Sequence, residues 1–210
     1  MNRTRVKVCG ICTVADASKV CKAGADAIGI VFYGKSPRNV GITLAREIVS
    51  SLPPFISVVG LFVNSSKQEI NQVLSTVQLD LLQFHGDEDE AFCNSFDRPY
   101  IKAVRVTSDT DLINSCQPYP SARGVLLDSY KKGLPGGTGE AFDWELIPKK
   151  LPLPVILAGG LNPGNVARAV SSVQPWAVDV SSGVEESPGK KDQKKIEQFI
   201  RAVGSIDKLK

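Results

Sequence analysis

Two apolar runs near the C-terminal end of the chain finish in small residues suited to binding phosphate. They are Val155-Ile-Leu-Ala-Gly-Gly160 and Ala177-Val-Asp-Val-Ser-Ser-Gly183, and one helix-length stretch separates them. Glycine lets backbone N–H groups approach an anion closely, and a short helix after the second run would add its dipole. If the two runs are neighbouring parallel strands, their ends predict a phosphate site.

A cysteine and an aspartate near the ends of two other apolar runs could transfer protons. Cys9 follows Val6-Lys-Val, and Asp128 follows Val125-Leu-Leu. A thiolate is reachable near neutral pH, and a carboxylic acid can stay protonated beside an apolar wall. On opposite sides of one pocket they could act as base and acid on a single substrate. Taken singly, Cys9 could equally be an inert core thiol, and Asp128 a cap.

Eight short apolar runs must position these residues. They are rich in Val, Ile and Leu with little alternation, which is typical of parallel strands covered on both faces. The predicted strands are Val6 to Gly10, Ala27 to Phe32, Ile56 to Val63, Leu81 to Gly86, Tyr100 to Val106, Gly124 to Ser129, Val155 to Gly160 and Ala177 to Gly183. The predicted helices are Val14 to Ala23, Thr43 to Leu52, Lys67 to Val77, Glu88 to Phe96, Asp109 to Ser115, Phe142 to Ile147, Pro163 to Ser172 and Asp192 to Val203.

Strict alternation of strands and helices predicts an α/β fold with a parallel sheet, and eight units favour closure into a (β/α)8 TIM barrel. An open, doubly wound sheet is the alternative, although such chains rarely place two glycine-ended strands last. The 210 residues are slightly few for a barrel, so residues 1–210 are expected to form a single domain. In a barrel, polar side chains at the strand ends carry the function.

Charge and hydropathy exclude several classes of protein. The net charge of +3 is spread without a basic stripe, which argues against a nucleic-acid partner. No apolar run approaches the roughly 20 residues that span a bilayer, and no signal-peptide core follows Met1 to Arg5. We therefore expect a cytoplasmic protein with no membrane partner.

The five cysteines argue against a disulfide framework because their number is odd. Cys9-Gly-Ile-Cys12 has the spacing of a thioredoxin-like redox pair, but nothing else in the chain supports that fold. The other three cysteines lie singly in helical patterns, and there is one histidine, so no metal site is expected.

Three further features carry expectations. Lys7 and Asp179 would lie on strands one and eight, which become neighbours on closure, and they are expected to form a buried ion pair. The glycine-rich run Tyr130 to Gly139 is expected to be an active-site lid. The acidic run Asp87 to Glu90 is expected to be the solvated start of helix four.

The motifs together resemble phosphoribosylanthranilate isomerase. The resemblance runs from about Val6 to Phe199 and is more specific than any single glycine pair. Phe84 and Cys12 are mild departures from the usual pattern. The motifs are Val6-Lys-Val-Cys-Gly-Ile11, Gly24-Ala-Asp-Ala-Ile-Gly-Ile-Val-Phe-Tyr33 with Ser36-Pro-Arg38, Val59-Gly-Leu-Phe-Val-Asn64, Gln83-Phe-His-Gly86, Leu126-Leu-Asp128, Gly136-Gly-Thr-Gly139, Ala158-Gly-Gly-Leu-Asn162 and Val178-Asp-Val-Ser-Ser-Gly-Val-Glu185.

The resemblance implies the Amadori rearrangement of N-(5-phosphoribosyl)anthranilate to 1-(2-carboxyphenylamino)-1-deoxyribulose 5-phosphate in tryptophan biosynthesis, without a cofactor. It implies that Asp128 is the general acid, which protonates the furanose ring oxygen. Cys9 is then the general base, which removes the proton from C2. The roles inferred from the residue types agree with this assignment.

The resemblance also implies a binding site for a small phosphosugar. Arg38, after strand two, would bind the anthranilate carboxylate, for which a planar guanidinium is suited. His85 would either order the pocket or titrate, and Asp179 would assist binding in addition to its structural role. The phosphate would lie on the backbone amides of Gly159, Gly160, Ser182 and Gly183, with help from Ser181.

Two other classes of function remain as alternatives. A barrel such as indole-glycerol-phosphate synthase would need a catalytic lysine at a strand end and glutamates in the mouth, which do not appear. A non-catalytic barrel would be expected to have lost Cys9 or Asp128. The protein is expected to be a monomer or a homodimer.

Overall fold

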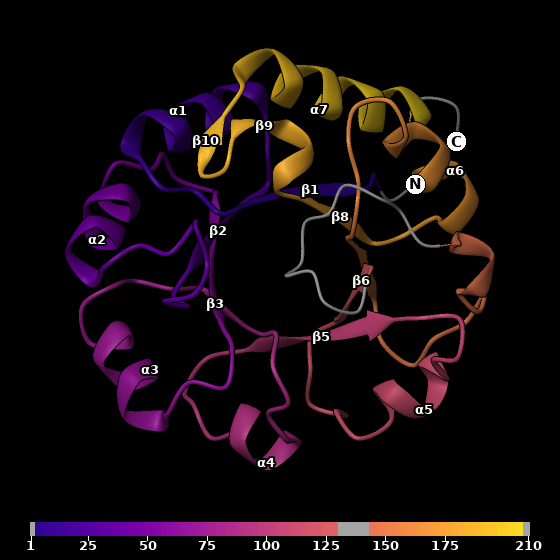
Figure 1. The fold of residues 1–210 in the computed structure, drawn as a ribbon, viewed down its shortest axis with the longest axis horizontal. Coiled ribbons are helices and arrows are strands. Elements are labelled where there is room, and N and C mark those ends of the chain that lie inside the picture. Colours follow the sequence, from indigo (N-terminus) through magenta and orange to yellow (C-terminus); the bar gives the residue numbers. More distant parts are fainter. Residues whose placement is uncertain (1–2, 130–142, 208–210) are drawn as a thin grey trace.

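The computed structural model describes residues 3–129 and 143–207 of the chain. Eight parallel strands form a closed barrel in sequential order from β1 to β8, with the helices around it (Figure 1). The strands are β1 (Arg5–Cys9), β2 (Ala27–Val31), β3 (Ser57–Phe62), β4 (Leu81–Phe84), β5 (Tyr100–Val106), β6 (Val125–Ser129), β7 (Val155–Leu157) and β8 (Ala177–Val180). The predicted (β/α)8 fold is confirmed.

Seven α-helices are present among the described residues: α1 (Val14–Ala23), α2 (Ile42–Ser50), α3 (Lys67–Leu74), α4 (Glu90–Cys93), α5 (Leu112–Cys116), α6 (Val166–Val173) and α7 (Gln193–Asp207). Their starts follow local rules: the Thr13 side chain accepts a hydrogen bond from Asp16 N, and Ser66 and Glu69 form a capping box. Gly24, with φ of 93°, ends α1 in the left-handed region.

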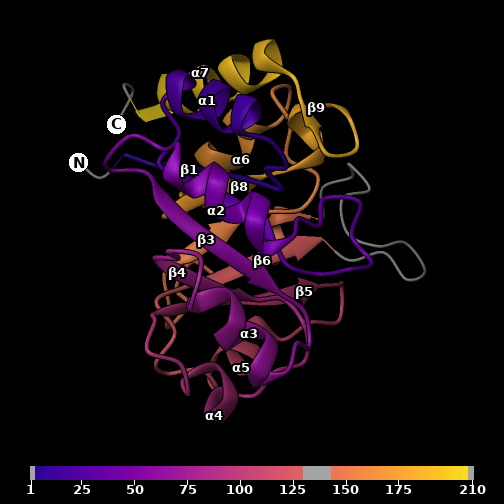
Figure 2. The ribbon, with the colours of Figure 1, turned by 90° about the vertical axis from the view of Figure 1, so that its left-hand side faces the viewer.

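Two elements differ from the sequence prediction. Instead of an α-helix at Phe142 to Ile147, the described part of that stretch holds a single 3₁₀ turn, η1 (Trp144–Leu146). After the second 3₁₀ turn, η2 (Ser182–Val184), an unpredicted antiparallel hairpin pairs β9 (Glu185–Ser187) with β10 (Lys190–Lys191). In the side view, β3 and β5 run toward the end of the barrel where β9 lies (Figure 2).

The inward faces of the strands divide the barrel into an apolar and a polar part. Alternation places Ala27, Val59, Ile101, Leu126 and Ile156 on the inner face, where they join one buried apolar cluster. Further toward the strand ends, the inner face changes to polar residues, including the buried Lys7, Gln83 and Asp179. The apolar cluster thus forms a floor below the polar residues at the C-terminal end of the barrel.

Candidate active site

A cavity of about 600 Å³ opens at the C-terminal end of the barrel strands. Such a position is where (β/α)8 enzymes carry their active sites. Among the described residues, the cavity is lined by all of the predicted site residues except Gly183: Cys9, Arg38, His85, Asp128, Gly159, Gly160, Asp179, Ser181 and Ser182. The structure therefore brings these residues to one cavity, and their roles stay predictions.

The sulfur of Cys9 lies in a slot beside β2. Cys9 is directly opposite Gly29 in the β1–β2 register, and a Cβ at Gly29 would lie 2.6 Å from the Cys9 Sγ. Burial raises the pKa of the Cys9 thiol, while the nearby Lys7 ammonium lowers it by a smaller amount. The thiolate is therefore harder to form than the sequence suggested, and Lys7 is the group that favours it most.

Lys7 and Asp179 form the predicted ion pair across the strands that close the barrel. They are register partners on β1 and β8, and Lys7 Nζ donates a 2.8 Å hydrogen bond to Asp179 Oδ2. Burial lowers the pKa of Lys7, but Asp179 and Cys9 together outweigh burial and raise that pKa. Asp179 Oδ1, also buried, has no hydrogen-bond partner among the described residues.

Asp128 is hydrogen-bonded to the single histidine. His85 Nε2 lies 3.2 Å from Asp128 Oδ2, and His85 Nδ1 lies 3.0 Å from Gln83 Nε2. The amide nitrogen of Gln83 can only donate, so with the side-chain amide in this orientation Nδ1 accepts and the histidine proton lies on Nε2, directed at Asp128. In the same orientation Gln83 Oε1 is buried without a hydrogen-bond partner among the described residues. Gln83, which sequence analysis did not assign to the site, is completely buried on the same face of β4 as His85. Gln83 precedes His85 by two residues, and this spacing on a strand could have identified Gln83 from the sequence.

The glycines after β7 and β8 hold the backbone in positions that a side chain would block. Gly159 and Gly160 have φ of 77° and 66°, and a Cβ at Gly159 would overlap the backbone nitrogen of Ser129. A Cβ at Gly183, in η2, would overlap the carbonyl oxygen of Leu161, which brings the two loops together. Within the described part of the chain, the N–H groups of Gly159 and Gly160 donate no hydrogen bond.

Two serines accompany these glycines. Ser181 Oγ donates a 3.0 Å hydrogen bond to the carbonyl oxygen of Cys9, which connects the end of β8 to the end of β1. Ser182 lines the cavity. The serine hydroxyl at 181 is therefore already engaged in joining two strands.

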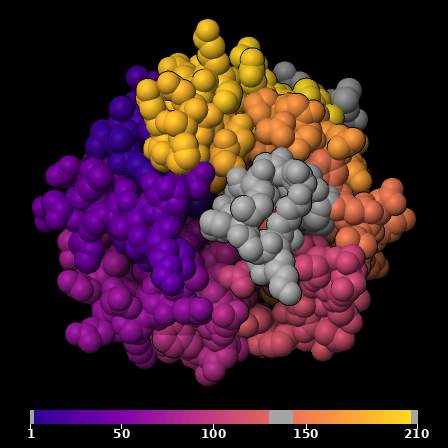
Figure 3. All heavy atoms as spheres, viewed as in Figure 1, coloured from indigo at the N-terminus to yellow at the C-terminus, as the bar shows by residue number. Residues whose placement is uncertain are grey.

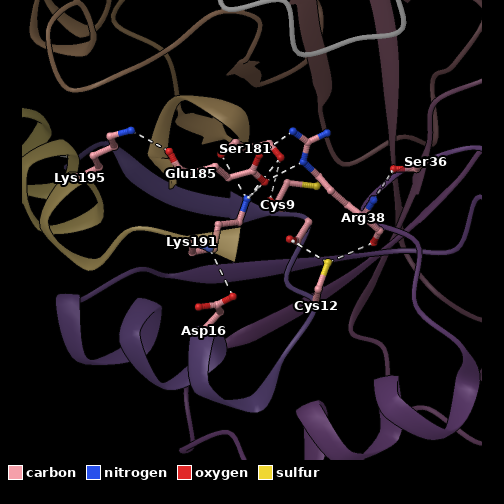
Figure 4. Close-up of polar contacts among 10 residues, drawn as sticks. Cys9, Cys12, Asp16, Ser36, Arg38, Ser181, Glu185, Lys191 and Lys195 are labelled. Atoms are coloured by element: carbon pink, nitrogen blue, oxygen red, sulfur yellow. Dashed lines mark hydrogen bonds and ion pairs between the residues drawn. The ribbon is translucent and has the colours of Figure 1, made fainter. Parts of the chain in front are cut away.

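Arg38 reaches the cavity from the loop after β2 and is held by a partner that sequence analysis missed. Its Nε and Nη2 donate to Glu185 Oε1 and Oε2 at 2.7 and 2.6 Å, as Figure 4 shows. A Cβ at Gly10 would lie 2.5 Å from the Cδ of Arg38, so glycine makes room for the arginine stem. Glu185 in turn accepts a 2.8 Å hydrogen bond from the buried Lys191.

The acidic run before α4 is only partly the solvated helix start that was expected. Asp89 caps α4 by accepting from Phe92 N, as its position predicts. Glu88 is instead buried, because it pairs with Lys102 at 3.1 Å and accepts from the backbone nitrogens of Asn64 and Gly86. This part of the expectation was wrong: the partners of Glu88 come from β5 and from the loops after β3 and β4.

Three remaining sequence expectations concern the lid, the cysteines and membrane spans. The expected lid, Tyr130 to Gly139, lies outside the described residues. All five cysteines are free, so Cys9 and Cys12 form no disulfide. None of the helices in the ranges 3–129 and 143–207 is long and apolar enough to cross a membrane.

Comparison with known proteins decides the family. A sequence profile described as N-(5'phosphoribosyl)anthranilate (PRA) isomerase matches residues 6–202. The chain belongs to the phosphoribosylanthranilate isomerase family. It is 57% identical over 203 residues to the N-(5'-phosphoribosyl)anthranilate isomerase of Pseudomonas putida strain W619, covering 97% of this chain and 98% of that one. A relative from Pseudomonas fluorescens strain Pf0-1 is 58% identical over 203 residues, with 97% of this chain and 100% of that one covered.

Solved structures of phosphoribosylanthranilate isomerases share the fold. The enzyme of Thermotoga maritima has a TM-score of 0.89 at 42% identity, with 96% of this chain and 99% of that one covered. Another, with a TM-score of 0.86 at 42% identity and the same coverage, was solved in complex with reduced 1-(o-carboxyphenylamino)-1-deoxyribulose 5-phosphate. As a member of this family, the chain is an isomerase of tryptophan biosynthesis, which confirms the resemblance and excludes the synthase and non-catalytic alternatives.

Proposed function

We propose that this phosphoribosylanthranilate isomerase acts by general acid–base catalysis, with Asp128 as the acid and Cys9 as the base. The observation that carries the proposal is that both side chains line one cavity, from strands separated by β7 and β8. Asp128 gives a proton to the furanose ring oxygen, so that the C1–O bond breaks and a protonated Schiff base forms. The Cys9 thiolate then removes the proton from C2, giving an enolamine that tautomerises to the ketone.

The surroundings of each group suit its proposed role. His85 Nε2–H, hydrogen-bonded to Asp128 Oδ2, stabilises the carboxylate that remains after proton donation and leaves Oδ1 to carry the transferred proton. Lys7 stabilises the Cys9 thiolate against the effect of burial. The chemistry moves protons within one molecule and requires no cofactor.

The substrate's two anionic ends would bind at opposite sides of the cavity. The phosphate would lie on the backbone N–H groups of Gly159, Gly160, Ser182 and Gly183, near Ser181, where glycine permits close approach. The same anion is present in the ligand of the related complex. The unpartnered Oδ1 of Asp179 can accept a hydrogen bond from a sugar hydroxyl.

The anthranilate carboxylate would bind Arg38 on the other side of the cavity. Arg38→Ala should raise KM far more than Arg38→Lys. A substrate analogue with aniline in place of anthranilate should be nearly indifferent to either change. If the analogue is affected as much as the natural substrate, Arg38 does not bind the carboxylate.

Three further properties stay predictions: a monomeric or homodimeric state, a cytoplasmic location, and a single domain that spans residues 1–210.

The acid–base proposal is tested by Cys9→Ser and Asp128→Asn. Each should lower kcat by about 100 to 10,000-fold, since each removes one proton-transfer group. Affinity for the reduced product analogue, measured by titration calorimetry, should stay within about tenfold, because neither change removes a phosphate or carboxylate contact. Near-full activity in either variant would overturn the assigned roles.

A further inference from the structure

A cluster of three charges, two of them buried, joins the β9–β10 hairpin to the loop after β2. It consists of Arg38, Glu185 and Lys191, which we call the hairpin charge cluster (Figure 4). Lys191 has a relative exposure of 1%, and Glu185 6%. Charges that are removed from water in this way cost free energy, so we looked for a role of this cluster other than stability.

The hairpin lies directly against the loop that carries Arg38. A Cβ at Gly189, in the hairpin turn, would be 3.3 Å from the carbonyl oxygen of Pro37. In the space-filling view, the yellow region after β8 borders the indigo and violet N-terminal segments (Figure 3). The backbone carbonyl of Glu185 also accepts a 2.7 Å hydrogen bond from Lys195 Nζ, which ties the hairpin to α7.

Glu185 fixes the orientation of the guanidinium. It accepts from Nε and Nη2 at once, which holds the plane of the guanidinium through two parallel hydrogen bonds. No further hydrogen bond to the guanidinium occurs among the described residues, and Arg38 lines the cavity. The donors of Nη1 are therefore left for a ligand.

This pairing creates an electrostatic problem that Lys191 solves. Arg38 and Glu185 alone sum to zero, and a neutral pair attracts a carboxylate weakly. Lys191 Nζ, 2.8 Å from Glu185 Oε1, restores one positive charge. Asp16, which accepts from the backbone nitrogen of Lys191 at 3.3 Å, is itself paired with Lys19 at 2.8 Å and does not cancel that charge.

We propose that Glu185 and Lys191 are positioning residues for the substrate carboxylate: Glu185 orients Arg38, and Lys191 keeps the cluster positive. The inference rests on the proposed role of Arg38 and extends it to residues that need not touch the substrate. A buried lysine whose only task was to hold the hairpin would affect substrates with and without a carboxylate alike. That difference makes the two explanations separable.

The test compares KM for phosphoribosylanthranilate with KM for the aniline analogue, which lacks the carboxylate. Lys191→Met should raise KM for the natural substrate about tenfold or more, the scale of one charge-assisted contact. The aniline analogue should change less than about threefold, and kcat should change little for either compound. Lys190→Met is the matched control, since Lys190 is the adjacent hairpin lysine, exposed and, within the described part of the chain, paired with Glu186 alone. It should behave as the wild type.

A rescue variant separates charge from folding. Glu185→Gln combined with Lys191→Met leaves Arg38 as the single charge of the cluster, so its KM for the natural substrate should fall below that of Lys191→Met. It should stay above that of the wild type, because the guanidinium is no longer held by a carboxylate. Should Lys191→Met fail to fold, Glu185→Gln alone still tests orientation, with a raised KM expected despite the added positive charge.

The outcomes distinguish this inference from the proposed function. If Arg38→Ala impairs both substrates equally, the assignment of the carboxylate site fails and this inference fails with it. If Arg38→Ala is selective for the natural substrate but Lys191→Met matches Lys190→Met, only the role of Lys191 is overturned. Equal effects of Lys191→Met on both substrates would likewise overturn it, in favour of a purely structural lysine.

Discussion

The buried ion pair at the closure of the barrel offers a quantitative test of the energetics. The side chains of Lys7 and Asp179 are 6% and 8% exposed, so Lys7→Met leaves a carboxylate buried without its cation. Removal of one partner of a buried pair costs about 3–5 kcal/mol. A typical protein has about 5–15 kcal/mol of folding free energy in total, so the variant should stay folded but lose a large fraction of it.

The double variant Lys7→Met/Asp179→Leu should recover most of that loss. It replaces the pair with apolar side chains, an exchange that is often neutral or stabilising because no charge remains to be desolvated. Arg201→Met provides the control: Arg201 and Glu197 form an exposed pair on α7, with side chains 75% and 42% exposed, and its loss should cost less than about 1 kcal/mol.

Equilibrium urea denaturation followed by tryptophan fluorescence measures all of these variants. Two tryptophans report on the transition, Trp144 buried and Trp176 half-exposed. The reasoning is refuted if Lys7→Met costs no more than the Arg201→Met control, or if the double variant is as unstable as Lys7→Met. Either result would mean that the Asp179 carboxylate does not remain a buried, unpaired charge when Lys7 is removed.

Three further predictions follow from the site. Gly183→Ala should lower kcat/KM by at least about tenfold, because the new Cβ forces the phosphate loops apart, whereas Gly204→Ala in α7, with open space around it, should be active and up to about 1 kcal/mol more stable. Gln83→Glu should move the proton of His85 from Nε2 to Nδ1 and lower kcat at least about tenfold. Because the chain has a single histidine, ¹⁵N NMR can follow its tautomer directly, and an unchanged tautomer would contradict the hydrogen-bond assignment. Burial raises the pKa of Glu185, but its cationic partners outweigh burial and lower that pKa. The contribution of Glu185 to folding free energy is therefore present above the ordinary glutamate pKa and is lost as pH falls through the lowered value. Urea titrations at decreasing pH should show a smaller loss of folding free energy for Glu185→Gln than for the wild type.

The barrel was predictable because its strands are coded locally. The strand Tyr100–Val106 and the helix Val14–Ala23 have the predicted bounds, since continuous apolar runs and a capped 3.6-residue pattern are properties of neighbouring residues. The hairpin of β9 and β10 was missed because its strands are short and polar. Its turn, Ser187-Pro-Gly189, was the remaining signal.

The buried charges were beyond local inference for a different reason. Glu88 and Glu185 are indistinguishable from surface glutamates until their partners are known. Lys102 lies 14 positions from Glu88, and Arg38 lies 147 positions from Glu185. Lys7 with Asp179 was predictable because closure of the barrel specifies that strands one and eight are neighbours. Long-range pairs can thus be inferred only where topology supplies the adjacency.

The segment from Ser181 to Lys191 joins the glycine-lined loop to the hairpin charge cluster without interruption. Under the proposed binding mode, this one stretch of chain would contact or support both anionic ends of the substrate. Its length would therefore set the distance between the two anion-binding sites. An insertion or deletion here would alter the spacing of both ends together, whereas the loop after β2 or β7 could change at one end alone. We therefore expect this segment to tolerate substitution at its exposed positions but not a change in length.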